Sequence, residues 1–362
     1  MISYRQLFTA LAVVSFIAME IGAGLVITEI AGEERYASLL IAIAPALMAL
    51  RGNTLVPYLY RAYTYIEIEG RRDFLSFTAM NICVSMATGV IASCIVVAAA
   101  ALAMHVDMTT ALDVLCIAIA SATVAKLIGI AILTYLVYSY ALRPQIEVED
   151  FIPTTASGLM DLLTPVAMTL PITVCRYISI ATVIAIAMLI AYAATRRRLR
   201  WIARNVCENV VSSLASLVSL VGGLVVSSYR QYLLRIEALK AYPLINAFLG
   251  IVGGLLYGSI TTDLHIYGEI RRSDLFEGLR KSFTGILIVG IAIVLVSTRA
   301  AAICISALTL GSLILLAVTL ALSKASIKLG LDPDNVVFPL VTGVGDLTGS
   351  TVLTILTLLF VD

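Results

Sequence analysis

The same six-residue pattern, [Ser/Thr]-Gly-x-x-Asp-Leu, occurs twice in the chain, as Ser157-Gly158-Leu159-Met160-Asp161-Leu162 and as Thr342-Gly343-Val344-Gly345-Asp346-Leu347. Each copy lies inside a strongly apolar run. A carboxylate within a membrane-spanning segment is expensive, so it is expected to have either a function or a partner. The repeat therefore predicts a two-fold cation site built on Asp161 and Asp346.

Composition indicates that these apolar runs lie in a membrane. Of the 362 residues, 60% are hydrophobic and 13% are charged, and the mean hydropathy is +1.02. Soluble domains carry roughly 25% charged residues. The chain is therefore predicted to be a polytopic protein of the lipid bilayer. Its net charge of +1 gives no basis for nucleic-acid binding.

Apolar runs of about 20 residues are long enough to cross roughly 30 Å of hydrocarbon. The first run contains Glu20 and is predicted to be a retained span rather than a signal peptide. The sequence predicts an all-α protein with about eleven transmembrane helices, near 6–30, 37–57, 74–104, 109–140, 152–174, 177–195, 207–228, 242–262, 282–298, 300–323 and 336–360.

Loop charge predicts how these spans are oriented. With the N-terminus in the cytoplasm, sixteen Lys and Arg residues fall in inside loops and six in outside loops. This excess follows the positive-inside rule. We expect a multi-pass protein of the cell membrane whose N-terminus is cytoplasmic and whose C-terminus lies outside.

The duplicated motif falls in the fifth and eleventh predicted spans, which divides the chain into five spans, one connector and five spans. A single connecting span restores the starting direction, so the halves are predicted to be parallel repeats about a pseudo-two-fold axis along the membrane normal. The expected parts are a first repeat (1–176), a connecting helix with a basic linker (177–206) and a second repeat (207–362). Because two repeats mimic a homodimer, one chain is expected to be sufficient.

Two segments resemble a known family of transporters. The run from Arg51-Gly52-Asn53 to Gly70 is similar to the second-helix signature of solute-carrier family 41 and the MgtE-type magnesium transporters. The run from Leu331-Asp332-Pro333-Asp334-Asn335 to Asp346 is similar to their fifth helix. The resemblance implies a non-enzymatic, double-repeat transporter of Mg²⁺ and other divalent cations, without cytoplasmic sensor domains.

The chemistry of magnesium agrees with this pattern. Mg²⁺ sheds water reluctantly and is usually held through one or two carboxylates and several retained waters. Asp161 and Asp346 are predicted to bind one such ion on the axis between the repeats. Ser157 and Thr342 lie four residues earlier, on the same helical face as each aspartate, where their hydroxyls can accept hydrogen bonds from coordinated water.

Other residues are assigned to the expected pathway by type and position. The glycines of the motif permit close backbone approach, and acidic residues at a pore entrance concentrate cations. The predicted pore-lining residues are Asn53, Gly158 and Gly343, and the predicted cytoplasmic mouth contains Glu149, Asp150 and Asp334.

Two alternatives remain open on the sequence. Glu20 and Lys126 are intramembrane charges that either form an ion pair or, through Glu20, couple magnesium movement to Na⁺ or H⁺ in an exchanger. The Gly343-Val344-Gly345-Asp346 run also spells the G-x-G-D motif of intramembrane aspartyl proteases, but no Tyr-Asp dipeptide, which those enzymes need, exists in the chain. A transporter is therefore the favoured function.

Overall fold

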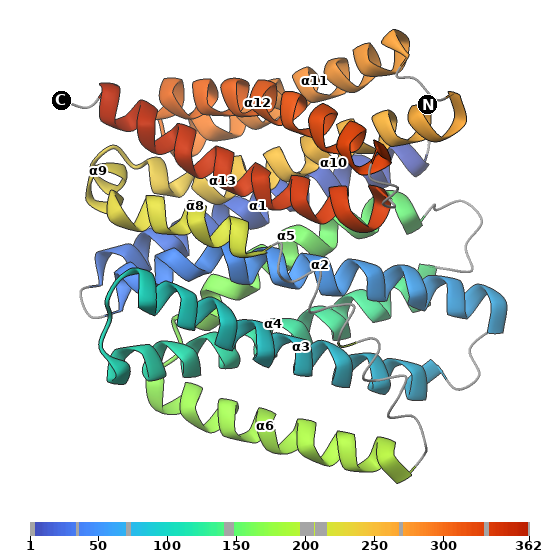
Figure 1. Ribbon diagram of the computed structural model, residues 1–362, viewed down its shortest axis with the longest axis vertical. Helices are drawn as coiled ribbons and strands as arrows, with labels where there is room; N and C mark the ends of the chain where they lie inside the picture. The colour runs from blue at the N-terminus through green and yellow to red at the C-terminus, as the bar shows by residue number, and fades with distance from the viewer. Residues whose placement is uncertain are drawn as a thin grey trace. The chain divides into compact units, whose positions relative to one another are not determined.

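The computed structural model describes residues 4–33, 36–69, 74–140, 148–195, 206, 216–267, 271–328 and 333–360. Every regular element in these residues is helical, so the predicted all-α class is confirmed. The elements are α1 (Tyr4–Gly32), α2 (Ala37–Glu69), α3 (Phe74–Ala103), α4 (Met108–Tyr140), α5 (Val148–Met168), α6 (Ile172–Thr195), α8 (Ser216–Ser228), α9 (Arg230–Arg235), η1 (Ala238–Lys240), α10 (Tyr242–Tyr267), α11 (Arg272–Val296), α12 (Ala301–Lys328) and α13 (Pro333–Phe360) (Figure 1).

Each of the eleven predicted spans overlaps one of these helices. Within the described residues, 6 helices are long and apolar enough to cross a membrane, and shorter apolar segments occur in α2, α8, α10 and α11. These helices support a multi-pass membrane protein. The full count of eleven spans and their arrangement as two repeats remain predictions.

Helix geometry satisfies the backbone polar groups that a bilayer cannot hydrogen-bond. Hydroxyl side chains are accommodated in the same way, because many donate to the carbonyl one turn earlier in their own helix. Thr88 donates to Val84, Thr123 to Ile119 and Thr319 to Leu315, at 2.7–2.9 Å. Buried hydroxyls are therefore compatible with these apolar helices.

The boundary between α5 and α6 differs from the prediction. The fifth span was expected to run to residue 174, but α5 ends at Met168 and α6 begins at Ile172. Pro171 explains the break, because proline has no N–H to donate and disfavours helical geometry in the residue before it. Pro171 also opens α6, since its carbonyl accepts the N–H of Cys175 at 3.0 Å.

The chain divides into two compact units, and α1 and α2 contribute residues to both. Unit 1 consists of residues 1–23 and 47–214, and unit 2 consists of residues 24–46 and 215–362. The predicted domain boundaries near 176 and 207 remain predictions.

Unit 1 is held together by an apolar core to which its first five helices contribute. Tyr58 on α2 contacts two other helices of this core. Its hydroxyl lies 2.9 Å from the Thr134 hydroxyl on α4, and its ring stacks on Phe77 of α3. The buried core residues are Ala12, Leu55, Tyr58, Leu59, Ala62, Ile66, Phe74, Ile130, Leu133, Val137, Ala156 and Met160.

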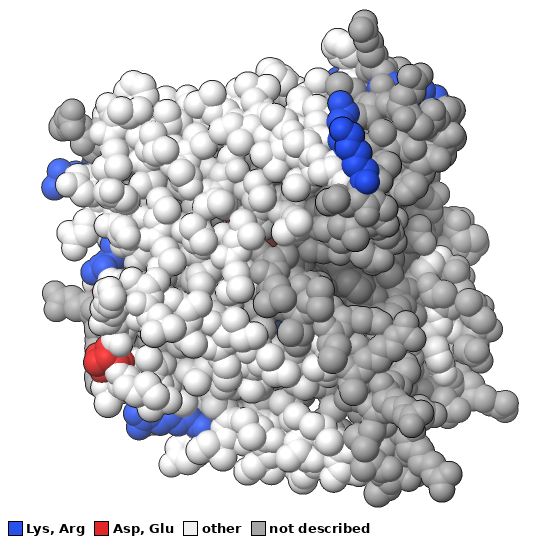
Figure 2. Space-filling model, viewed as in Figure 1, with Lys and Arg blue, Asp and Glu red and all other residues white. Residues whose placement is uncertain are grey.

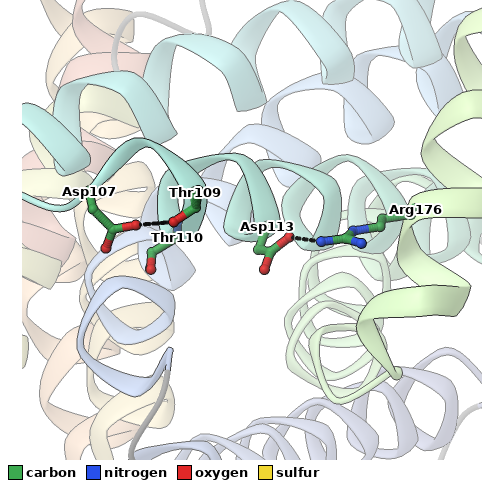
Figure 3. Close-up of polar contacts among 5 residues, drawn as sticks. All are labelled: Asp107, Thr109, Thr110, Asp113 and Arg176. Atoms are coloured by element: carbon green, nitrogen blue, oxygen red, sulfur yellow. Dashed lines mark hydrogen bonds and ion pairs between the residues drawn. The ribbon is translucent and has the colours of Figure 1, made fainter.

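Polar contacts join the connecting helix α6 to α4 within unit 1. The Arg176 guanidinium donates to Asp113 Oδ1 at 2.5 Å, Ser179 donates to the Cys116 carbonyl at 2.8 Å, and Thr182 donates to Thr123 Oγ1 at 3.1 Å. Figure 3 shows the Arg176–Asp113 pair one to two turns from the start of α4. Successive turns of α6 are thus fixed to α4.

The start of α4 is capped by Asp107 (Figure 3). Its carboxylate accepts the backbone N–H of Thr110 at 2.9 Å and a hydrogen bond from the Thr109 hydroxyl. These bonds, that from the Thr109 hydroxyl first, lower the pKa of Asp107 to about 2. An aspartate at this position satisfies helix N–H groups that lack an intrahelical partner.

Unit 2 is organised around α13, which packs against α8, α10 and α12. Helix α10 also packs against α11 and α12. A glycine on α8 allows close approach on its other side, because a Cβ at Gly223 would overlap the carbonyl oxygen of Ala42 in α2. Helix α8 therefore lies between α13 and the part of α2 that belongs to this unit.

Apolar side chains are exposed along several helices, as expected for surfaces that face lipid. Tyr177 on α6 and Leu295 on α11 are 77% and 79% exposed. Figure 2 shows a face on which uncharged residues predominate among those described.

Candidate functional site

Asp161 lies on α5 in unit 1 and is buried, with 7% of its surface exposed. The Ser157 hydroxyl, one turn earlier on the same helix, lies 3.4 Å from its Oδ2 atom. Two apolar side chains of α1 lie close to Gly158 in the same motif. A Cβ at Gly158 would lie 3.0 Å from Phe16 Cδ2 and 3.1 Å from Met19 Cε. Ser157 is therefore near the carboxylate, as the motif predicts.

Asp346 lies on α13 in unit 2 and is half-buried. The hydroxyl of Ser219, on α8, donates to its Oδ2 atom at 2.6 Å. Ser219 is fully buried. A hydrogen bond to an ionised carboxylate is shorter and stronger than one between neutral groups. Thr342 lies one turn before Asp346 and is half-buried.

Three further polar side chains form a hydrogen-bonded group that ends at the Asp346 backbone carbonyl. The Ser350 hydroxyl donates to the Asp346 carbonyl at 2.6 Å, and the Asn246 amide donates to Ser350 Oγ at 3.3 Å. Tyr242 Oη lies 3.2 Å from Ser350 Oγ. Tyr242, Asn246 and Ser350 are all buried. We call Ser219, Tyr242, Asn246 and Ser350 the Asp346 polar set.

Glycines bring the neighbouring helices close to each aspartate-bearing helix. A Cβ at Gly22 on α1 would lie 2.9 Å from Leu162 Cδ1, and one at Gly222 on α8 would lie 3.1 Å from Leu347 Cα. Leu162 and Leu347 each follow the motif aspartate. Gly22 and Gly222 therefore each lie close to the leucine that follows a motif aspartate.

The other predicted pathway residues are described in part. Gly158 and Gly343 are buried in α5 and α13. Asn53 lies on α2, Glu149 on α5 and Asp334 on α13, but their side chains lie outside the described residues, as does that of Asp150. The predicted cytoplasmic mouth and the role of Asn53 therefore remain predictions.

Glu20 and Lys126 are both deeply buried in unit 1, with exposed fractions of 0% and 1%. The Lys126 ammonium donates to the Ser85 carbonyl at 2.7 Å. Gly89 provides the space for it, because a Cβ there would lie 3.2 Å from Lys126 Nζ. Lys126 does not snorkel to an interface in this arrangement. Its predicted pairing with Glu20 remains a prediction.

The described residues contain no group of three or more His, Cys, Asp or Glu side chains able to hold a metal ion. A dehydrated, protein-enclosed cation such as Ca²⁺ takes six to eight oxygen ligands. Each unit contains one motif aspartate with a serine hydroxyl nearby.

The Asp346 polar set was not predicted from the sequence. A serine within an apolar run carries little information by itself, because most such hydroxyls bond to their own helix. The available signal was the spacing to glycine, since Ser219 lies one turn before Gly222.

Comparison with known proteins supports the resemblance seen in the motifs. Residues 242–356 match the family model MgtE, described as a divalent cation transporter. This range contains Asp346 and most of the Asp346 polar set. No curated protein and no solved structure matches the chain. The predicted MgtE-type resemblance is confirmed over this segment, and it marks the chain as a membrane protein of ion transport.

Proposed function

Because residues 242–356 carry an MgtE-type sequence of the divalent cation transporters, we propose that this chain moves Mg²⁺ across the cell membrane. Asp161 and Asp346 are the ligands of one ion in the pathway, each contributed by one repeat. Ser157 and Thr342 bind water of that ion. The N-terminus is cytoplasmic, and one chain forms the complete pathway.

The observation that carries this proposal is the duplicated carboxylate within apolar helices. Asp161 is buried beside Ser157, and Asp346 accepts a hydrogen bond from a buried serine. Charged groups at such positions are costly and mark ion pathways. Two carboxylates neutralise one divalent ion, so the charge of the bound state is balanced.

Transport requires that the site attract the ion and also release it. Two carboxylates that contact a largely hydrated Mg²⁺ meet both conditions, because most of the inner-shell water is never removed. The hydroxyls of Ser157 and Thr342 accept hydrogen bonds from that water and favour an ion with an octahedral shell. A larger ion with a looser shell fits this arrangement less well.

A coupled exchanger is the second candidate, and Glu20 is the residue that favours it. Its carboxylate is fully buried in α1, on the same unit as Asp161. An intramembrane carboxylate of this kind can take up a proton or Na⁺. In that case magnesium flux depends on an imposed Na⁺ or pH gradient.

The protease alternative loses support from the surroundings of its motif. MgtE is a family of transporters rather than of enzymes. Gly345 of the G-x-G-D run packs against α10, where a Cβ would lie 3.2 Å from the Gly250 nitrogen. Close helix packing therefore explains this glycine.

The proposal is tested by flux into liposomes that contain the purified chain. We expect Mg²⁺ to enter down its gradient and expect Asp161→Asn and Asp346→Asn each to abolish most of the flux. Separate Na⁺ and pH gradients distinguish a channel from an exchanger, since only an exchanger responds to them. Near-normal flux in both variants would contradict the proposal.

A further inference from the structure

We propose that Ser219 is a positioning residue for Asp346, and that its hydrogen bond holds this cation-binding carboxylate in a fixed orientation. This inference rests on the proposed function of Asp346. It concerns a residue on a different helix from the motif, contributed by α8.

The first support is the direction of the Ser219 hydroxyl. A serine hydroxyl has a single proton to donate. Many hydroxyls in these helices donate to the carbonyl one turn earlier, as Thr354 does to Ser350 at 2.8 Å. Ser219 instead donates across to Asp346 Oδ2 at 2.6 Å, from a fully buried position. Its proton is therefore committed to the carboxylate.

The second support is the packing that makes this reach possible. Gly222 lies one turn after Ser219 on α8, and a Cβ there would lie 3.1 Å from both the Asp346 carbonyl oxygen and Leu347 Cα. The α8 backbone thus approaches the α13 backbone at the level of Asp346. A short side chain such as serine can then contact the carboxylate directly.

The backbone of Asp346 is fixed as well. Ser350 donates to its carbonyl at 2.6 Å, and Ser350 is itself contacted by Asn246 and Tyr242 of α10. All three side chains are buried. Both the peptide and the carboxylate of Asp346 are therefore tied to neighbouring buried groups, so that χ1 and χ2 of this residue are restricted.

Orientation matters because a ligand fixed in advance does not lose conformational freedom when the ion binds. A carboxylate has about four acceptor sites, so the bond from Ser219 leaves capacity for Mg²⁺ or its water. Ser219 thus raises the affinity of the site without contacting the ion. Its loss weakens binding more than it changes the maximal rate of transport.

The test measures thermal unfolding and liposome flux over a range of Mg²⁺ concentrations. Ser219→Ala is expected to raise the half-maximal Mg²⁺ concentration in both assays by roughly tenfold, the effect of losing one charge-assisted hydrogen bond. Ser219→Thr, which keeps the donor, is expected to restore it. Ser219→Cys, a weaker donor of similar size, is expected to lie between and serves if the alanine variant does not fold.

Ser227→Ala is the matched control. Ser227 is also on α8, is also buried, and also donates to another helix at 2.6 Å, to the Ser38 carbonyl. Its loss should lower stability without magnesium and leave the half-maximal concentration unchanged. If Ser219→Ala or Ser219→Cys behaves like Ser227→Ala, Ser219 is only structural and the inference is wrong.

Asp346→Asn in the same assays separates this inference from the proposed function. If that variant keeps the full response to Mg²⁺, the proposed function fails, and the inference about Ser219 fails with it. If Asp346→Asn loses the response while the Ser219 variants keep theirs, only the inference fails. Loss of response in Asp346→Asn together with a raised half-maximal concentration in Ser219→Ala supports both.

Discussion

The two halves of this chain share a motif but surround it differently. The Asp346 carboxylate accepts a hydrogen bond from a serine on another helix. Its backbone carbonyl accepts one from Ser350, which in turn contacts two further buried polar side chains, Asn246 and Tyr242. In the motif of Asp161, Gly158 packs against Met19 and Phe16 of α1. The described neighbours of the two motifs therefore differ, although the motif itself is shared.

The family match lies in the second half of the chain. It covers residues 242–356, which lie entirely in unit 2 and include Tyr242, Asn246 and Ser350. The first half carries buried charge elsewhere, at Glu20 and Lys126.

The largest expected effect concerns the two buried charged residues of the first half, Glu20 and Lys126. If Glu20 and Lys126 form a pair, Glu20→Gln or Lys126→Met alone should destabilise the protein by about 3–5 kcal/mol, because each leaves one buried charge uncompensated. The double variant should be milder than either. Thermal unfolding of the purified variants checks this order.

A double variant as unstable as the sum of the two single variants would contradict the pair. Flux provides the second measurement on the same proteins. A double variant that folds and transports Mg²⁺ but no longer responds to Na⁺ or pH gradients would assign coupling to Glu20.

The next effect compares two glycines with equally little free space. A Cβ at Gly223 in the second half would overlap the backbone carbonyl of Ala42, whereas one at Gly129 in the first half would overlap the end of the Met160 side chain. Gly223→Ala should cost about 1–3 kcal/mol or more, since backbone must move. Gly129→Ala should cost less, because a methionine can change rotamer.

Melting temperatures of the two alanine variants test this difference. The pair is matched because both glycines lie within helices and both changes add one methyl group. Equal destabilisation would mean that Met160 is as rigid as the backbone of α2.

The smallest expected effect is the pH dependence of the α4 cap. Hydrogen bonds from Thr109 and Thr110 lower the pKa of Asp107 to about 2, below the roughly 3.9 of an unfolded aspartate. A lowered pKa in the folded state contributes stability above about pH 4 and loses it as the pH falls toward 2. Helix α12 of unit 2 follows Ala300, whose side chain has no oxygen with which to cap a helix.

Comparison of the wild-type protein with Asp107→Asn from pH 7 to pH 3 checks this prediction. The difference in melting temperature should be small, constant above pH 5 and smaller at pH 3. A difference that grows on acidification would have the wrong sign and would contradict the role of Asp107.

Much of the fold could be predicted from the sequence because apolar runs correspond directly to helices. The ends of the helices were less accurate. Helix α2 continues to Glu69 and α11 begins at Arg272, beyond the predicted 57 and before the predicted 282. Hydropathy reports the part of a helix that suits lipid, whereas the helix itself continues wherever its backbone hydrogen bonds are satisfied.

The site could be predicted only as far as its own helix. Asp161, Asp346 and Ser157 could be proposed as site residues because the motif is local and repeated. Ser219 of α8 donates to Asp346, and Asn246 of α10 donates to Ser350. Such contacts between helices depend on where glycines allow close approach. Single residues in an apolar run do not reveal such contacts without the packing.

The most direct test of the central claim is a double-mutant cycle on Asp161 and Asp346, read as the rise in melting temperature that Mg²⁺ produces. One shared site predicts that Asp161→Asn and Asp346→Asn each remove most of the rise, and that the double variant loses almost nothing more. Two independent sites predict that each single variant keeps about half of the rise and that the losses add. The shared site requires the first result, and additive losses would contradict it.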